Sequence, residues 1–188
     1  MHLKRITMTI HNSSINGVFI IKPTVFKDSR GYFFESFNSK FFKEKTNIDI
    51  TFVQDNQSCS QKNVLRGLHF QKPPYDQGKL VSVIKGSVLD VAVDIRKNSP
   101  TYGKHFTAIL SEKNHYMMYL PSGMAHGFLT LENDTIFSYK CTNYYNKESE
   151  GCILWNDHDL NIDWLTNDVI LSEKDKKGEK FCSFVTNF

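Results

Sequence analysis

The chain has 188 residues, of which 40% are hydrophobic and 23% charged, so it is long enough for one domain with a sizeable core and too short for two ordinary ones. This composition excludes an intrinsically disordered chain. The formal net charge is +3, and the one basic run, residues 174–177, is interrupted by Asp175, so no charged face for nucleic acid is indicated. We expect a single domain over residues 1–188.

Neither a leader sequence nor a membrane span is predicted. Residues 1–9 lack the apolar core of a signal peptide, and no stretch approaches the roughly 20 apolar residues that cross a bilayer. The four cysteines are widely spaced and include no CxxC pair, a pattern typical of reduced thiols in a cytosolic protein. We therefore expect a cytoplasmic protein without membrane contact.

The first third of the chain is predicted to mix strands with one helix. Residues 17–22 and 31–37 have the pattern of a strand pair joined by a polar turn at 27–30. Residues 38–46 then carry a short helical pattern with Phe41 and Phe42 on one side.

From residue 51 onward the pattern is almost entirely that of short strands. The candidates are residues 51–58, 64–71, 79–85, 88–95, 105–110, 115–120, 127–132 and 135–142. In the fourth of them, Asp90, Ala92 and Asp94 share one face and apolar residues the other. After Trp155 the pattern loosens into Asp- and Asn-rich turns and ends in a short helix near 172–177. Many short strands at regular spacing predict an all-β sandwich or small barrel, most simply a jelly roll, with a short helical C-terminal tail.

The densest group of chemically active side chains lies at residues 66–71. In a regular strand, Arg66, Leu68 and Phe70 would occupy one face, and Gly67, His69 and Gln71 the other. Imidazole is the commonest general base at neutral pH, so His69 is a candidate base. The alternative is a buried histidine with a purely structural hydrogen bond.

A second histidine, His126, lies in a Pro-Ser-Gly-Met-Ala-His-Gly segment where glycine would let a ligand approach closely. Metal-binding barrels of the cupin type carry a His-x-His pair. Here the position two residues after His69 is Gln71, and the positions flanking His126 at that spacing are Met124 and Phe128. These residues argue against a metal centre and for acid–base chemistry without a cofactor.

The chain resembles the dTDP-4-dehydrorhamnose 3,5-epimerase family of cupin-fold enzymes. The stretches that carry the resemblance are residues 25–38, 53–56, 64–71, 77–81, 90–96, 121–128, 139–145, 148–151, 155–157 and 171–175. They follow the family's order over nearly the whole chain, which makes the combined signal highly specific.

The resemblance implies inversion of C3 and C5 in a dTDP-linked 4-keto-6-deoxyhexose, through removal and return of a proton beside the ketone. It assigns His69 as the base, Asp175 as the carboxylate that orients it, Lys79 as the cation facing the enolate, and Tyr139 as the acid on the opposite face. Each has a plainer alternative. Asp175 would cap a helix with Ser172, Lys79 would lie on a solvated strand edge, and Tyr139 would be one more sheet aromatic.

The resemblance also implies a set of substrate-binding residues and a homodimer. It assigns Arg66 to the diphosphate, Tyr145 to stacking on thymine, and Arg30 and Glu35 to the site of the partner subunit. The remaining positions that it assigns to binding are Gln54, Asn56, His126, Glu150 and Lys174.

Three other functions stay open at this point. An epimerase that inverts only C3 or C5, or that uses another nucleotide sugar, would have the same fold. A non-catalytic sugar-nucleotide-binding cupin would be expected to lose His69, Lys79 or Tyr139, and all three are present. A metal-dependent cupin is opposed by the missing His-x-His pair.

Overall fold

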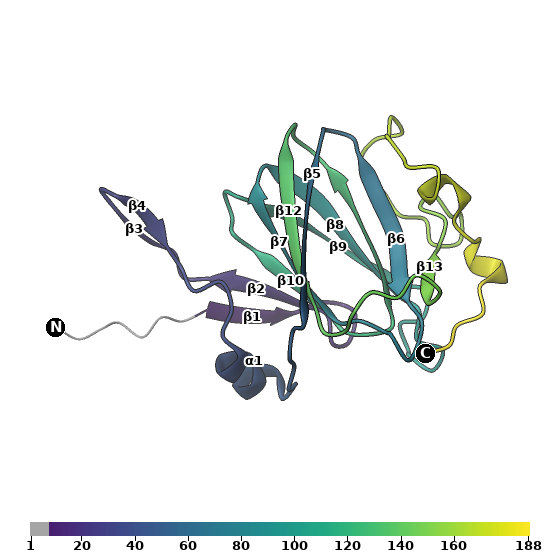
Figure 1. Ribbon diagram of the computed structural model, residues 1–188, viewed down its shortest axis with the longest axis horizontal. Coiled ribbons are helices and arrows are strands. Elements are labelled where there is room, and N and C mark those ends of the chain that lie inside the picture. Colours follow the sequence, from purple (N-terminus) through teal and green to yellow (C-terminus); the bar gives the residue numbers. More distant parts are fainter. Residues whose placement is uncertain (1–7) are drawn as a thin grey trace.

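Two antiparallel sheets enclose the core in the computed structural model, which describes residues 8–188 (Figure 1). The first sheet has the order β1 (Met8–Asn12), β2 (Phe19–Pro23), β10 (Met117–Leu120), β7 (Lys79–Lys85), β12 (Thr135–Cys141) and β5 (Gln54–Ser60). The second has the order β13 (Glu150–Cys152), β6 (Leu65–Gln71), β11 (Met124–Thr130), β8 (Ser87–Asp94) and β9 (His105–Ser111). The all-β jelly roll predicted from the sequence is confirmed.

The main core lies between the two sheets. It joins apolar side chains of the six-stranded sheet, such as Val81 and Met118, to side chains of the five-stranded sheet, such as Met124 and Phe128. Phe128 and Phe137 stack across this space with ring centroids 4.0 Å apart. Side chains on the inner face of either sheet therefore point toward a shared interior.

The five-stranded sheet is covered on both faces, so every residue of β8 is buried. Val88 and Ala92 pack in the core between the sheets, whereas Val91 and Val93 pack against the outer cluster that includes Trp164 of the C-terminal segment. Figure 1 shows this segment, in yellow, lying beside β6 and β13. Its helical content is limited to two 3-10 turns, η1 (Asp175–Lys177) and η2 (Phe181–Ser183), rather than the longer helix expected at 172–177.

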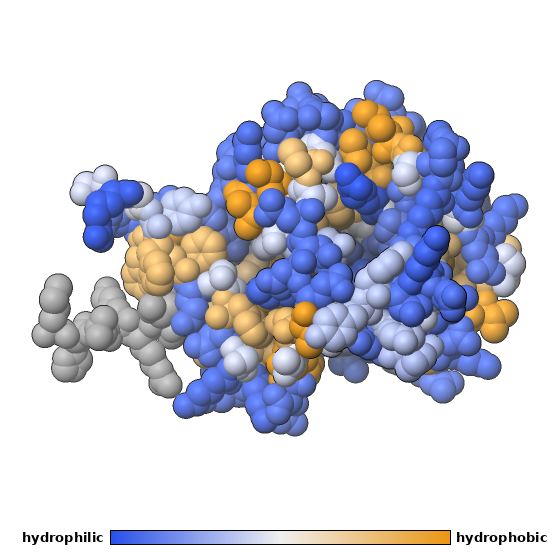
Figure 2. Space-filling model, viewed as in Figure 1, coloured by the Kyte–Doolittle hydropathy of each residue, from blue (hydrophilic) through white to orange (hydrophobic). Residues whose placement is uncertain are grey.

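The predicted pairing of residues 17–22 with 31–37 is wrong. β2 pairs with β1 and β10, and a separate hairpin is formed by β3 (Phe26–Asp28) and β4 (Gly31–Phe33). The polar turn was placed correctly, but it closes a much shorter hairpin. Figure 1 shows this hairpin projecting from the body, and Figure 2 shows apolar surface on it and where it leaves the body.

The predicted helix is present as α1 (Ser39–Thr46). The side chain of Asn38 accepts a hydrogen bond from the Phe41 amide, which caps the first turn. Phe42 is fully buried against Tyr119 of the first sheet, with ring centroids 4.9 Å apart. No helix within residues 8–188 combines the length and apolarity needed to cross a membrane.

A bulge in β6 changes which side chains share a face. Arg66 pairs with Phe128 and His69 with His126, so two residues of β6 lie opposite one of β11. Phe128 and His126 are two residues apart on β11, so their side chains face the same side of the sheet. Arg66 and His69, which lie opposite them, therefore face that side too. The regular alternation predicted from the sequence, which put them on opposite faces, is wrong here.

Glycine is required at this bulge. Gly67 has a φ of +138°, and a Cβ at this position would lie 2.5 Å from the Gly127 Cα. Any larger residue would push the two strands apart.

Candidate active site

A cavity of about 260 Å³ is lined by side chains from both sheets and from the loops before β7 and after β12. Its lining residues are Gln54, Asn56, His69, Phe70, Gln71, Gln77, Lys79, Tyr139, Tyr145 and Glu150. Three of the four predicted catalytic residues, and four of the predicted binding residues, therefore meet in one place.

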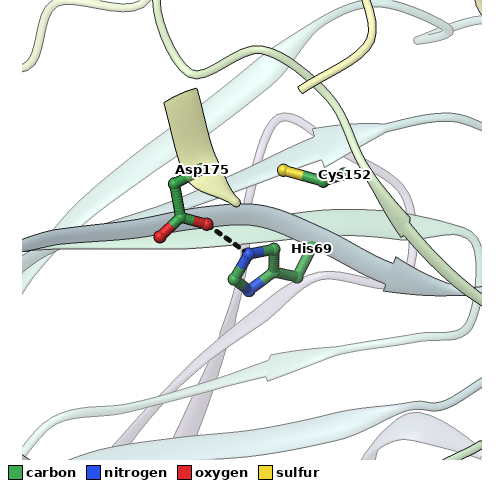
Figure 3. A group of neighbouring side chains, drawn as sticks. All are labelled: His69, Cys152 and Asp175. Atoms are coloured by element: carbon green, nitrogen blue, oxygen red, sulfur yellow. Dashed lines mark hydrogen bonds and ion pairs between the residues drawn. The ribbon is translucent and has the colours of Figure 1, made fainter. Parts of the chain in front are cut away.

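His69 and Asp175 form a close pair, shown in Figure 3. His69 Nε2 lies 2.5 Å from Asp175 Oδ1, and the Ser172 hydroxyl donates to Asp175 Oδ2 at 2.7 Å. Burial acts to raise the pKa of Asp175, but the hydrogen bonds from His69 and Ser172 outweigh it and the pKa is lowered. Since a carboxylate only accepts, the ring donates from Nε2, and in the neutral imidazole this tautomer leaves the lone pair on Nδ1.

Asp175 takes part in the predicted cap with Ser172 and also contacts His69. Its own amide donates to the Ser172 hydroxyl at 3.1 Å, as a cap predicts. Its carboxylate, however, reaches His69, which is 106 positions away in the sequence. The side chain of Asp175 is only 4% exposed, whereas that of His69 is 30% exposed, so the histidine is the member of the pair that faces the cavity.

Lys79 and Tyr139 lie together on the wall formed by the six-stranded sheet. The Lys79 Nζ is 6.0 Å from the centroid of the Tyr139 ring. β7 lies between β10 and β12, so the alternative of a lysine on a solvated sheet edge is wrong. Burial lowers the pKa of Lys79 and raises that of Tyr139. At neutral pH the phenol is therefore protonated.

His126 lies next to His69 on the neighbouring strand, as expected, but it does not line the cavity. It is 7% exposed, and its Nε2 lies 3.0 Å and 3.1 Å from the two carboxylate oxygens of Asp90. Asp90 is fully buried and was not identified as a partner from the sequence. The alternation predicted for β8 placed Asp90 on the polar face of the strand but did not indicate its hydrogen-bond partner.

The mouth of the cavity is held by a chain of hydrogen bonds. The Tyr145 amide donates to Gln54 Oε1 at 2.9 Å, and Gln54 Nε2 donates to Asn56 Oδ1 at 3.0 Å. The Tyr145 hydroxyl donates to Glu150 at 3.2 Å, and Lys174 forms an ion pair with Glu150. These five residues, all predicted to bind substrate, form one connected group.

The three other predicted binding residues do not line the cavity. Arg66 is exposed, and its guanidinium donates to the Ser60 hydroxyl at 3.1 Å and 3.2 Å. Arg30 lies at the hairpin turn, paired at 2.5 Å with Asp28, and its side chain is 87% exposed. In the sequence, Glu35 lies just after the end of the same hairpin. Within one protomer the structure therefore does not bring Arg30 or Glu35 to the cavity.

Several residues near the site were missed by sequence reasoning. Gln71 lines the cavity and accepts a hydrogen bond from the Asn146 amide at 2.9 Å. Its position two residues after His69, on the same face of a regular strand, could have indicated that it lines the same cavity. Cys152 pairs with His69 across β13 and β6, and nothing in its sequence neighbourhood indicates this. Among the described residues, Cys152, His69 and Asp175 offer possible metal-ligand atoms that all lie within 4.8 Å of one another.

Comparison with known proteins identifies the family. The dTDP-4-dehydrorhamnose 3,5-epimerase family matches residues 12–183. The chain belongs to this family. The dTDP-4-dehydrorhamnose 3,5-epimerase of Shigella flexneri is 49% identical over 174 residues, which cover 93% of this chain and 96% of the relative. The family membership and isomerase class predicted from the sequence are thereby confirmed.

Two solved structures of relatives bear on the fold and on the reaction. A Legionella pneumophila epimerase in complex with dTDP-4-keto-L-rhamnose is 48% identical, with a TM-score of 0.89 and coverage of 93% of both chains. A 3'-monoepimerase from Streptomyces bikiniensis, in complex with dTDP-quinovose, is 31% identical with a TM-score of 0.85. The match covers 90% of this chain and 86% of the Streptomyces chain. The same fold thus occurs in proteins described as inverting different numbers of centres.

Proposed function

We propose that the cavity inverts C3 and C5 of dTDP-4-dehydro-6-deoxy-D-glucose to give dTDP-4-dehydro-L-rhamnose. The observation that carries the proposal is the His69–Asp175 pair at the edge of a cavity whose opposite wall holds Lys79 and Tyr139. The names of the Shigella and Legionella relatives support the same reaction.

Inversion needs a base and an acid on opposite sides of the sugar ring. His69 stands on the five-stranded sheet and Tyr139 on the six-stranded sheet, so a sugar held between the sheets has one of them on each side. His69 Nδ1 removes the proton beside the ketone, and Asp175 stabilises the imidazolium that forms. The Tyr139 phenol then delivers a proton to the other face of the same carbon.

The intermediate of this reaction is an enolate, which must be stabilised because the carbon acid is weak. A cation aimed at the developing oxyanion in a site shielded from water supplies that stabilisation. Lys79 is the cavity-lining cation on the same wall as Tyr139. Its ammonium is therefore assigned to the C4 oxygen, and the chemistry needs only side chains of this chain.

The nucleotide extends out of the cavity. A volume of about 260 Å³ lies just below the range of about 300–1,000 Å³ that is typical of ligand pockets, which suits a sugar ring but not a whole nucleotide sugar. Arg66 faces the same side as His69, where its guanidinium would bind the diphosphate. Tyr145 at the mouth is 52% exposed, which leaves its ring available to stack on thymine.

The neighbouring residues complete this binding surface. Gln54 and Asn56 offer neutral hydrogen-bonding groups to the nucleotide, while Glu150 and Lys174 hold the Tyr145 side of the mouth. His126 supports His69 from the adjacent strand.

A second subunit is assigned to close the site. Tyr32 and Phe33 on the projecting hairpin are 58% and 60% exposed, which is unusual for large apolar side chains on a lone protomer. In a homodimer this hairpin would pack on the partner and carry Arg30 and Glu35 to the partner's cavity. We place this single-domain enzyme in the cytoplasm, consistent with its unpaired cysteines.

Deuterium uptake from heavy water tests the reaction. The protein is incubated with dTDP-4-keto-6-deoxyglucose, and the sugar is read by mass spectrometry and by NMR. Two enzyme-dependent deuterons, at C3 and C5, are expected. One deuteron would favour the single-centre reaction described for the Streptomyces relative. None, with an active control enzyme in parallel, would refute the proposal and favour a binding protein.

A further inference from the structure

Cys152 has no part in the proposed reaction, yet its thiol lies beside the catalytic pair. The ligand atoms of His69, Cys152 and Asp175 all lie within 4.8 Å of one another. They come from three separate segments, β6, β13 and η1. Figure 3 shows the Cys152 thiol directed toward the His69–Asp175 pair. The fold therefore gathers a nitrogen, a sulfur and an oxygen donor at one point.

We propose that His69, Cys152 and Asp175 form a Zn²⁺ site whose occupation switches off the base. The donor set of imidazole, thiolate and carboxylate is the one that zinc prefers, and three protein ligands leave a fourth position for water. Mg²⁺, which requires oxygen ligands in octahedral geometry, does not fit it.

The geometry requires only small side-chain movements. In a tetrahedral zinc site with metal–ligand distances of about 2.0–2.3 Å, neighbouring ligand atoms lie about 3.3–3.8 Å apart. The His69–Asp175 contact of 2.5 Å has to open by about 1 Å, and a thiol within 4.8 Å has to approach by a similar amount or less. The thiol is held only weakly, with Sγ 3.9 Å from the Gly67 carbonyl oxygen and 3.6 Å from that of Ile153.

The exchange of ion and protons balances without any redox step. Zn²⁺ replaces the thiol proton of Cys152, which passes to solvent, and the Asp175 carboxylate is already ionised. Burial raises the pKa of Cys152 to about 11, so without metal this thiol is not a reactive nucleophile and carries a proton to release.

Inhibition follows from the histidine tautomer and rests on the proposed role of His69. Nε2 is the ring nitrogen that faces Asp175, and it carries the ring proton there. Zinc bound at Nε2 requires the neutral ring to carry that proton on Nδ1 instead. Nδ1 then has no lone pair with which to accept a proton from the sugar.

Metal binding is tested on the full-length chain, independently of turnover. CoCl₂ is added as a spectroscopic stand-in for zinc, and ZnCl₂ binding is measured by calorimetry. We expect one equivalent per chain and a thiolate-to-cobalt charge-transfer band in the parent. In Cys152→Ala the band should be lost and the zinc affinity should fall at least about tenfold, because even removal of an outer-shell partner costs about 10–100-fold. Cys59→Ser and Cys182→Ser, which alter the exposed cysteines, are the matched controls and should bind like the parent.

Turnover supplies the second measurement. One equivalent of Zn²⁺ should stop the parent enzyme, EDTA should restore it, and MgCl₂ should have no effect. Cys152→Ala and Cys152→Ser should turn over normally in EDTA and resist zinc. Unchanged zinc binding in both Cys152 variants, or a charge-transfer band that is lost with Cys59 or Cys182 instead, would overturn the proposal. A parent protein that binds zinc through Cys152 but has no epimerase activity would refute the proposed function alone.

Discussion

Replacing Tyr139 by phenylalanine should separate proton removal from inversion. The phenol faces the cavity from β12, and within the described residues its hydroxyl makes no hydrogen bond to the protein. The ring keeps its contact with Phe137, at a centroid distance of 6.1 Å. Tyr139→Phe therefore removes the proposed acid and little else, and we expect the free energy of unfolding to change by less than about 1 kcal/mol.

The expected loss in the rate of inversion is about 10²–10⁴-fold, which is the usual contribution of a positioned general acid. The proposed removal of the proton by His69 and the proposed stabilisation of the enolate by Lys79 do not involve the phenol. After tautomer exchange with solvent, His69 can return a deuteron to the face from which it took the proton. Deuterium should then enter the sugar with retained configuration, at a rate reduced by less than about tenfold. NMR of the sugar in heavy water measures exchange and configuration together.

Tyr145→Phe is the matched control, since it makes the same chemical change at the mouth of the cavity. It removes a hydrogen bond to Glu150 and should alter substrate binding while leaving exchange and inversion coupled. If Tyr139→Phe lost exchange and inversion equally, or if it inverted the sugar at the parental rate, the assignment of His69 and Tyr139 to opposite faces would be refuted.

Four further outcomes are expected. His69→Ala should abolish deuterium exchange while dTDP binding stays within about threefold; a variant that fails to fold would mean that His69 is chiefly structural. Asp175→Asn should lower kcat by about 10²–10⁴-fold with KM little changed, because it leaves the imidazolium unsupported, and a KM effect alone would contradict this. Mixing equal amounts of the inactive His69→Ala and Arg30→Ala proteins under exchange conditions should restore activity at about a quarter of the sites, whereas no recovery would exclude shared sites. Burial acts to raise the pKa of Asp94, but hydrogen bonds from Arg96 and from neighbouring hydroxyls hold it at about 2. Since this folded pKa lies below the unfolded value of about 3.9, the ionised carboxylate stabilises the fold by about 2 kcal/mol above pH ~4, and this is lost as the pH falls toward 2. Asp94→Asn should flatten that acid limb in denaturation curves, and an unchanged limb would rule out Asp94 as its source.

Local sequence patterns correctly predicted those elements whose conformation depends mainly on residues close together in the chain. β7 was predicted with its observed bounds, Lys79–Lys85, because four of its seven residues are large and apolar and Gly86 follows it. α1 was predicted from the helical pattern of residues 38–46, with Phe41 and Phe42 on one side, and the structure adds the cap at Asn38. β1 was not predicted, because Met8–Asn12 is a short segment whose strand conformation depends on pairing with β2.

Apart from His69 and His126, which the local sequence already indicated, the candidate site was predicted through the resemblance to a family, since its chemistry depends on contacts between distant segments. Asp175 is 106 positions from His69, and Lys79 and Tyr139 become neighbours only when β7 pairs with β12. Spacing along the chain cannot indicate such contacts. The Asp90–His126 pair illustrates the same limit, because each residue alone has the pattern of an ordinary polar position in a strand.

The bulge in β6 connects the backbone to the chemistry. A regular strand would have put Arg66 on the face away from His69. The bulge instead turns Arg66 to the side of His69, and the Gly67 backbone makes a small contribution to lowering the pKa of Asp175. That contribution helps to keep the carboxylate ionised, which the proposed role of the base requires. Gly67 and Gly127 are in contact at the bulge, and a Cβ on either of them would push the two strands apart, so the proposed site depends on both glycines through the backbone.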